Sequence, residues 1–165
     1  MKFYLVDRIE TVVPGKRIVT TKALSLAEEY LADHFPAFPV LPGVLMIESM
    51  VQAAAWLVRI QQEFTKSIVV LHAARNVRYA RFVHPGDLFR AEIDAIEITD
   101  TSAKVKGAGY VGEKPCVTGR LELRCFNLAE TAPHLAASDE SILADLKKQF
   151  ELIGGPAVLA GAATA

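Results

Sequence analysis

The longest apolar stretch of the chain lies between Gly43 and residue 60. Its apolar residues surround the helical axis on every side, and the exceptions are Glu48, Ser49, Gln52 and Arg59. A helix that is apolar all round is normally buried in a protein core. The pattern therefore predicts a long buried helix over residues 43–64, with a carboxylate inside it that needs a partner or a function.

The segment before this helix is punctuated by three prolines, Pro36, Pro39 and Pro42. Proline fixes φ and disfavours helical structure in the residue before it. Residues 35–42 are therefore expected to form a stiff, extended connector. Upstream of the connector, Ser25 is placed to cap a short helical turn that leads to His34.

Most of the remaining apolar residues alternate with polar ones or form short β-branched runs, which is typical of strands. The expected strands cover 3–8, 17–24, 68–79, 88–99, 102–111 and 116–127. One long helix with several antiparallel strands predicts an α+β fold, in which a curved sheet wraps around the helix. A single sheet leaves a face and an edge to cover, so a dimer is expected.

A change of character after residue 127 divides the chain into a main domain, 1–127, and an extension, 128–165. The extension begins with a linker that contains alanine and proline. It continues as a short amphipathic helix over 138–152, with Ser138 as the expected N-cap, and Gly154 helps to end it. The small residues that follow are expected to form a flexible tail.

Composition narrows the class of protein. The formal net charge is −1 and 22% of residues are charged, with no long basic block, which gives no electrostatic case for binding nucleic acid. The two cysteines have no metal-ligand spacing, and no signal peptide is visible. The apolar run falls short of the ~20 residues of a membrane span and contains Glu48 and Gln52. A cytoplasmic protein that is not inserted in a membrane is expected.

Three residues carry the parts of an acid–base site. Glu48 and Gln52 are four residues apart and share one helix face, and Gly43 lies at the first helical turn, where backbone N–H groups are free. An imidazole at His34, an amide at Gly43 and a carboxyl at Glu48 are what forming and discharging an enolate requires. A solvated loop histidine and a hydrogen-bonded core glutamate would explain the same residues, so both interpretations stay open at this point.

A resemblance to a known family adds to this pattern. Residues 34–54 read HFPAFPVLPGVLMIESMVQAA, which resembles the signature of the β-hydroxyacyl-acyl carrier protein dehydratases, a family with the hot-dog fold. Further likeness is found in FYLVDRI near the start and in ARNVRYARFVHPGD later, so it covers roughly residues 3–127. The resemblance implies that His34 is the catalytic histidine, Glu48 the catalytic acid and Gly43 the donor of the amide that polarises the thioester carbonyl. Glutamate at position 48, where the isomerising branch of the family carries aspartate, resembles the branch that dehydrates without isomerising.

The resemblance also implies a reaction and its partners. It implies dehydration of a 3-hydroxyacyl thioester to a trans-2-enoyl thioester, with no metal or redox cofactor. The acyl chain would arrive on the phosphopantetheine arm of acyl carrier protein. Histidine and acid would come from different subunits of a homodimer, with a hexamer, a trimer of dimers, as a further assembly. The chain departs from the family pattern at Asp33 and Ala37, where glycine is usual.

Other residues are expected around this site. Gln52 matches a family glutamine, and the substrate-binding candidates are Gln52, Val44, Phe38, Phe82 and His84. The clustered arginines are candidates for docking an acidic carrier protein, or form a solvated strand end: Arg75, Arg78 and Arg81. Two alternatives remain, a hot-dog acyl thioesterase in which Glu48 activates water, and a non-catalytic acyl-binding partner subunit.

Overall fold

A computed structural model of the chain describes residues 3–35 and 37–162. The elements in chain order are β1 (Arg8–Val13), β2 (Arg17–Ala23), α1 (Tyr30–Asp33), α2 (Gly43–Gln61), β3 (Ile68–Tyr79), β4 (Leu88–Ile98), β5 (Ser102–Val111), β6 (Lys114–Phe126), the short 3-10 helices η1 (Leu128–Glu130) and η2 (Pro133–Leu135), α3 (Ala136–Leu152) and α4 (Gly155–Ala162). Pro36 of the expected connector and residues 163–165 of the expected tail lie outside the described residues.

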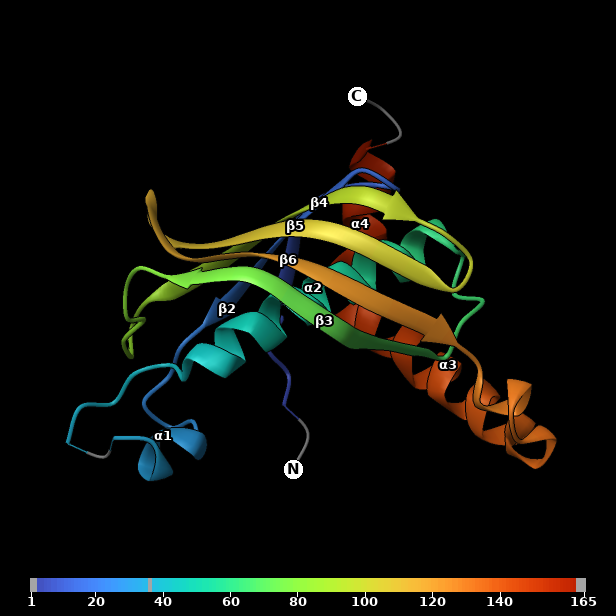
Figure 1. Cartoon of the computed structure of the whole chain (residues 1–165), viewed down its shortest axis with the longest axis horizontal. Coiled ribbons are helices and arrows are strands. Elements are labelled where there is room, and N and C mark those ends of the chain that lie inside the picture. The colour runs from blue at the N-terminus through green and yellow to red at the C-terminus, as the bar shows by residue number, and fades with distance from the viewer. Residues whose placement is uncertain (1–2, 36, 163–165) are drawn as a thin grey trace.

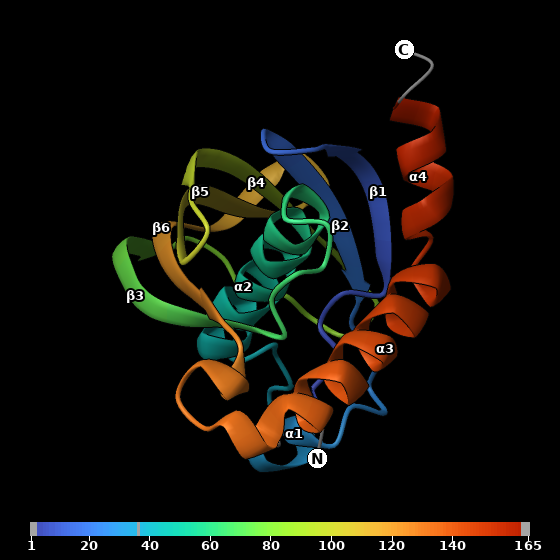
Figure 2. The ribbon, with the colours of Figure 1, turned by 90° about the vertical axis from the view of Figure 1, so that its right-hand side faces the viewer.

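The strands form one antiparallel sheet in the order β1-β2-β4-β5-β6-β3. The sheet curves around α2, as Figure 1 shows from the front and Figure 2 shows nearly along the helix. This is the hot-dog arrangement expected from the sequence. Because β1 and β3 are the outer strands, they are the two edges of the sheet that another element or another chain can cover.

The core lies between α2 and the concave face of the sheet. Met50, Ala53 and Leu57 of the helix are completely buried. The sheet approaches the helix closely at Gly107 on β5, where an added Cβ would lie 2.7 Å from the terminal carbon of Met50. Among the described residues, α2 is the one helix long and apolar enough to cross a membrane, and 67% of its apolar window is buried inside the fold. It is the core helix of this domain.

The first strand differs from the prediction, because residues 3–7 are not part of the sheet and β1 begins at Arg8. The Leu5 backbone bonds instead to side chains of α2: its amide donates to Gln52 and its carbonyl accepts from Ser49. The long helix also ends earlier than expected, at Gln61. Glu63 and Phe64 have positive φ angles of 52° and 58°, which no α-helix accommodates.

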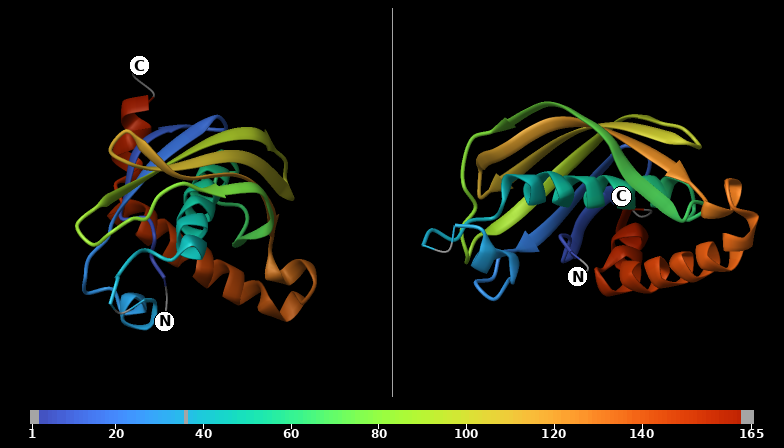
Figure 3. Two further views of the ribbon diagram at one scale, coloured as in Figure 1. Left: turned by 60° about the vertical axis from the view of Figure 1, so that its left-hand side comes forward. Right: turned by 60° about the horizontal axis from the view of Figure 1, so that its bottom comes forward.

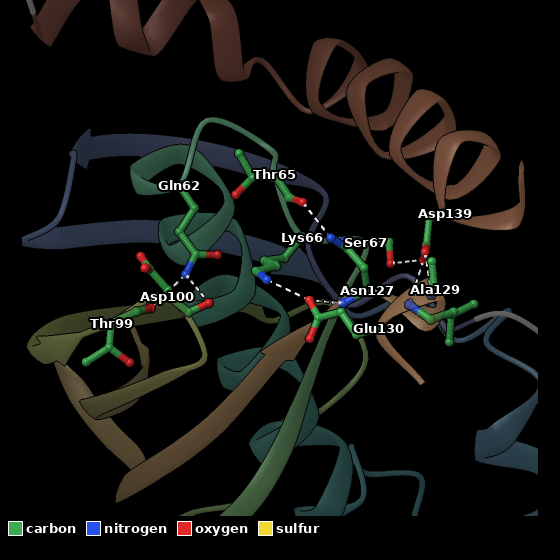
Figure 4. Close-up of polar contacts among 11 residues, drawn as sticks. Gln62, Thr65, Lys66, Ser67, Thr99, Asp100, Asn127, Ala129, Glu130 and Asp139 are labelled. Atoms are coloured by element: carbon green, nitrogen blue, oxygen red, sulfur yellow. Dashed lines mark hydrogen bonds and ion pairs between the residues drawn. The ribbon is translucent and has the colours of Figure 1, made fainter. Parts of the chain in front are cut away.

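The extension is attached to the main domain by a polar network (Figure 4). Asp139 of α3 accepts hydrogen bonds from the amides of Leu128 and Ala129, both at 2.9 Å, and from the Ser67 hydroxyl. Ser138, which was expected to cap α3, lies inside the helix; the N-cap position is Leu135 and has no side-chain hydrogen bond. The residue next to the expected cap thus bonds to the first two amides of η1, whose N-cap is Asn127, and fixes α3 to the domain.

Aromatic packing completes this attachment. Phe150 of α3 packs against Trp56 and Phe64, with ring centroids 5.8 Å and 5.3 Å apart. α3 therefore runs along the open side of the sheet, the side that also holds α2 (Figure 3). The expected tail is helical over Gly155–Ala162, because α4 packs against β1 (Figure 2). The Ile9 amide of β1 donates to the Ile153 carbonyl at 2.9 Å, so the extension covers the β1 edge.

Candidate active site

His34 is the residue that directly follows α1, and it begins the connector to α2. Its φ and ψ of −112° and 101° are extended, its side chain is half-buried, and its ring lies 4.3 Å from that of Phe35. Phe35 has φ 51°, in the left-handed region that bulky residues seldom adopt. Strain of this kind persists only where the surroundings impose it, and it is concentrated at functional sites. The neighbouring Asp33 is exposed.

Gly43 is the first residue of α2 and follows Pro42, the N-cap. The Pro42 carbonyl accepts from the amides of Leu45 and Met46, at 2.9 Å and 3.1 Å. Among the described residues, none accepts a hydrogen bond from the Gly43 amide, which lies at the positive end of the helix dipole. An amide in this position is suited to stabilising a developing negative charge on oxygen.

A ring from β3 explains why position 43 is glycine. A Cβ there would lie 3.0 Å from Cε1 and 3.2 Å from Cζ of Tyr79. Both separations are tighter than ordinary van der Waals contact. The tyrosine ring thus lies directly against the Gly43 backbone and forms a wall beside its amide.

A pocket of about 350 Å³ brings these residues together. His34, Gly43 and Tyr79 lie on it, and apolar side chains supply much of the rest of its surface, among them Val40, Leu41, Met46 and Phe82. The volume and the lining suit an apolar chain that ends in a polar, reactive group. An imidazole and a free helix amide on one apolar pocket provide a base and an oxyanion donor for such a group.

Glu48 is not among the residues that line this pocket. It is half-buried on α2, and its Oε1 accepts a hydrogen bond from Gln52 Nε2 at 3.0 Å. Gln52 also accepts from the Leu5 amide and donates to the Phe3 carbonyl. Within one chain, the structure therefore brings His34 to Gly43 and leaves the carboxyl of Glu48 outside their pocket.

Three of the expected substrate-binding residues form one aromatic cluster. The ring of Phe38 lies 5.6 Å from both Phe82 and His84, edge-on in each case, and Phe82 lies 6.5 Å from His84. All three are exposed, and Phe82 also lines the pocket. Val44, beside Gly43, is 71% exposed. Large exposed apolar groups at a pocket rim indicate a surface that another molecule covers.

The three arginines do not form one patch of free charge. Arg75 Nε lies 2.8 Å from Glu122 Oε1, and this hydrogen bond lowers the pKa of Glu122. Arg81 lines the pocket, while Arg78 is exposed on β3 opposite Thr118. Arg78 and Arg81 are therefore better placed than Arg75 to meet an acidic partner near the pocket.

Sequence reasoning missed an ionic cluster around the buried Lys22 side chain, which involves the segment that precedes His34. Lys22, whose side chain is 9% exposed, lies 2.8 Å from Glu28 and 3.2 Å from Asp7. Burial lowers the pKa of Lys22, but the hydrogen bond to Glu28 and the charge of Asp7 outweigh it and raise that pKa. The cluster ties the residues before α1 to β2 and to the N-terminal segment. Only the fold brings these separated charges together.

Tyr79 was also missed as a site residue. It lies inside one of the segments that resembled the dehydratases, but its contact with Gly43 depends on how β3 lies against the start of α2. The charged and aromatic residues around it gave no signal that distinguishes a pocket wall from a strand end.

Comparisons with known proteins identify the family of this chain. The fold is of the hot-dog class, and the FabA-like domain family model matches residues 1–118. A Clostridium kluyveri protein named 3-hydroxyacyl-[acyl-carrier-protein] dehydratase FabZ is 38% identical over 119 residues, covering 72% of this chain and 83% of that protein. The FabZ of Pelotomaculum thermopropionicum is 40% identical over 112 residues, covering 68% and 80%. The chain belongs to the FabA-like family.

Solved structures show the same fold at low sequence identity. The dehydratase heterocomplex ApeI:P from Xenorhabdus doucetiae has a TM-score of 0.64 and 20% identity, covering 81% of this chain and 90% of that chain. A hypothetical thioesterase protein with coenzyme A from Streptococcus pneumoniae has a TM-score of 0.52 and 11% identity, covering 73% and 85%. At these identities the likeness concerns the fold alone, which dehydratases and thioesterases share.

Proposed function

We propose that this protein is a 3-hydroxyacyl-acyl carrier protein dehydratase of fatty-acid or related acyl-chain synthesis. It removes water from a 3-hydroxyacyl thioester and yields a trans-2-enoyl thioester. The observation that carries the proposal is the pocket in which the His34 imidazole and the free amide of Gly43 lie on one apolar surface. Membership of the FabA-like family and the names of the FabZ relatives support the same reaction.

The reaction uses the parts of the site in sequence. His34 removes the proton from the α-carbon, and the electron pair left behind is delocalised onto the thioester oxygen, which the Gly43 amide stabilises. One such donor is worth about 2.7–4 kcal/mol in the transition state. The pair then forms the α,β double bond, the C–O bond to the hydroxyl breaks, and Glu48 gives the leaving oxygen the proton that makes it water.

Glu48 reaches the pocket from a second copy of the chain. It lies outside the lining of the pocket that holds His34 of its own chain. The β1 edge is covered by the extension, whereas β3 is a long edge strand whose Val70, Leu71 and Tyr79 are exposed. An uncovered edge of this length favours pairing with another chain. The working unit is therefore a homodimer, and a hexamer built from three dimers is the further assembly to test.

The substrate is delivered by acyl carrier protein. Its phosphopantetheine arm brings the thioester past the rim formed by Val44, Phe38, Phe82 and His84, and Arg78 and Arg81 attract the acidic carrier. The chemistry is proton transfer and cleavage of one C–O bond, with no net oxidation or reduction, so it requires no metal or redox cofactor. We assign the protein to the cytoplasm, where the carrier and its acyl chains are handled.

A single assay tests the proposal. The protein is incubated with a 3-hydroxyacyl thioester while enoyl absorbance and free thiol are recorded together. Enoyl formation without thiol release is the expected result; thiol release alone identifies a thioesterase, and no reaction indicates an acyl-binding subunit. The variant His34→Ala is expected to be inactive, whereas His134→Ala, which changes an exposed histidine of η2, serves as the matched control and keeps full activity.

A further inference from the structure

Tyr79 brings a hydroxyl to the wall of the pocket beside the Gly43 amide. The ring meets Gly43 with its hydroxyl end: Cε1 and Cζ lie 3.0 Å and 3.2 Å from the position of a Cβ at residue 43, and Cδ1 lies 3.5 Å from it. That position is two covalent bonds from the amide nitrogen of Gly43. The phenol and the amide therefore border the same small region of the pocket, which both residues line.

The hydroxyl of Tyr79 is free to bond to a ligand. Among the described residues, none forms a hydrogen bond with it, and Tyr79 is 53% exposed. Of the described side chains that line the pocket, three carry a hydrogen-bond donor, namely His34, Tyr79 and Arg81. His34 serves as the base and Arg81 carries a full charge, so Tyr79 supplies the neutral O–H.

A β-bulge in β3 precedes Tyr79. Arg75 lies opposite Arg120 of β6. Arg78 lies opposite Thr118, so β3 advances by 78 − 75 = 3 residues where β6 advances by 120 − 118 = 2. Asn76, inside the bulge, has φ 53°. Side chains alternate between the two faces of a strand, so the extra residue moves every later side chain of β3 to the opposite face.

The bulge is therefore the reason that Tyr79 faces α2. Tyr79 lies opposite Val117, which is completely buried, and without the extra residue its ring would lie on the outer face of the sheet. The backbone directly after it is held as well, because the Ala80 amide donates to the Cys116 carbonyl at 2.8 Å. Bulges occur often next to active sites, where they redirect a side chain.

We infer that Tyr79 is a catalytic residue: its hydroxyl donates a second hydrogen bond to the thioester oxygen, beside the bond from the Gly43 amide. This assignment rests on the proposed function and adds to it. The proton transfers remain with His34 and Glu48.

A second donor suits the charge that develops on this oxygen. When His34 has taken the α-proton, the electron pair left on the α-carbon is delocalised onto the thioester oxygen, which becomes enolate-like. The Tyr79 hydroxyl keeps its own proton throughout, so no bond of the proposed reaction changes. Hydrogen bonds to an oxygen strengthen as its negative charge grows. The hydroxyl therefore favours the transition state more than the bound substrate.

Two substitutions of a single oxygen atom test this role. Tyr79→Phe removes the hydroxyl and keeps the ring against Gly43. Tyr110→Phe is the matched control, because Tyr110 lies on β5, packs against the Arg90 guanidinium at 5.2 Å and does not line the pocket. Melting temperature, kcat and KM are measured for both, with the 3-hydroxyacyl thioester as substrate.

Tyr79→Phe is expected to lower kcat by about 10- to 100-fold with little change in KM, because a hydrogen bond to a charged oxygen has an effect of this size. Tyr110→Phe is expected to keep the wild-type kcat, and both variants should keep the melting temperature. An unchanged kcat in Tyr79→Phe would overturn the inference. A raised KM at normal kcat would show a contact with the bound substrate alone, and a joint loss of kcat and melting temperature would show a structural role.

The carbonyl stretch of a bound thioester distinguishes this role from a contact with the leaving hydroxyl. In a His34→Ala background, which does not turn the compound over, the protein is loaded with a trans-2-enoyl thioester, which has no 3-hydroxyl group. A hydrogen bond to the carbonyl weakens the C=O bond and lowers its infrared frequency. Adding Tyr79→Phe is expected to raise that frequency. An unchanged band contradicts the inference, whatever the effect on kcat.

The inference and the proposed function fail in different ways. A wild-type protein without dehydratase activity overturns the proposed function, and the carbonyl band then still tests the contact between Tyr79 and the thioester. An active wild type whose kcat and carbonyl band do not respond to Tyr79→Phe overturns the inference and leaves the proposed function in place. A protein that binds no thioester overturns both.

Discussion

A methyl group at position 43 has too little room beside Tyr79. In Gly43→Ala, the new Cβ would lie 3.0 Å from Tyr79 Cε1, whereas ordinary contacts begin at 3.4 Å, so the ring must move by 3.4 − 3.0 = 0.4 Å or more. Among the described residues Gly43 is not one of the glycines with positive φ, so the backbone itself accepts alanine. Alanine favours a helix by up to about 1 kcal/mol over glycine, and the fold should therefore survive.

The displaced ring is a wall of the pocket, so the substitution is expected to act on catalysis. Displacements approaching 1 Å cost about 100-fold, and a shift of a few tenths of an ångström together with a methyl group beside the amide is expected to cost about 10-fold in kcat/KM. That corresponds to about 1.4 kcal/mol of transition-state stabilisation. The enoyl absorbance assay measures the loss, and thermal unfolding measures the stability.

A double-mutant cycle checks the cause. In a Tyr79→Ala background the clash is absent, so adding Gly43→Ala should cost much less than it does in the wild type. Gly161→Ala is the control, because a Cβ there meets no atom within 4 Å. A wild-type rate for Gly43→Ala, or the same cost in both backgrounds, would refute the argument that the glycine is required by the Tyr79 ring.

Three further predictions concern the parts that support the site. Burial raises the pKa of Asp139, but the hydrogen bonds from Ser67 and from two backbone amides outweigh it, so the folded-state pKa is lowered. The contribution of Asp139 to stability is therefore present above its unfolded-state pKa of about 3.9 and is lost as pH falls through the lower folded-state pKa. Thermal unfolding against pH should show this loss in the wild type and not in Asp139→Asn. Phe150→Ala should lower the free energy of unfolding by about 3–5 kcal/mol because the ring is 7% exposed, while Leu152→Ala, which changes a residue that is 86% exposed, should stay within about 0.5 kcal/mol in denaturant titration. Lys22→Met should leave two carboxylates near each other without their cation and destabilise the protein by about 1.5–3 kcal/mol, and unchanged unfolding would contradict the importance of this cluster.

The sequence predicted most of the sheet because the pattern of apolar and polar residues that makes a strand lies within the strand itself. The strands β3 and β5 occur at the bounds expected from their apolar and polar residues, and α2 begins at the expected Gly43. Residues 3–7 have the composition of a strand as well, yet their backbone bonds to Gln52 and Ser49. Whether residues 3–7 join the sheet depends on which surface lies beside them in the fold, and their own sequence does not show this.

The extension was predicted less well for a related reason. The small residues of α4 have little periodicity of their own, and the helix packs against the β1 edge of a sheet formed much earlier in the chain. Similarly, Ser138 and Asp139 are both good capping residues by type, and only the position of η1 decided that Asp139 makes the bonds.

The candidate site likewise contains residues that the sequence predicts and residues that only the fold brings to it. The proline-rich connector and the start of α2 placed His34 and Gly43 near each other, and the pocket contains both. The contribution of Tyr79 depends on the end of β3, and the contacts of Gln52 depend on residues 3–7. Both are tertiary contacts between segments far apart in the chain.

Subunit mixing tests the central claim most directly, namely that His34 and Glu48 act together from different chains. His34→Ala and Glu48→Gln are each prepared as inactive proteins, mixed, and allowed to exchange subunits, with exchange verified by differently tagged chains. Random exchange into dimers gives about a quarter of the sites one intact histidine and one intact glutamate, so about a quarter of wild-type dehydration should return. No recovery in a mixture that has exchanged, or full activity of either variant alone, would contradict the account.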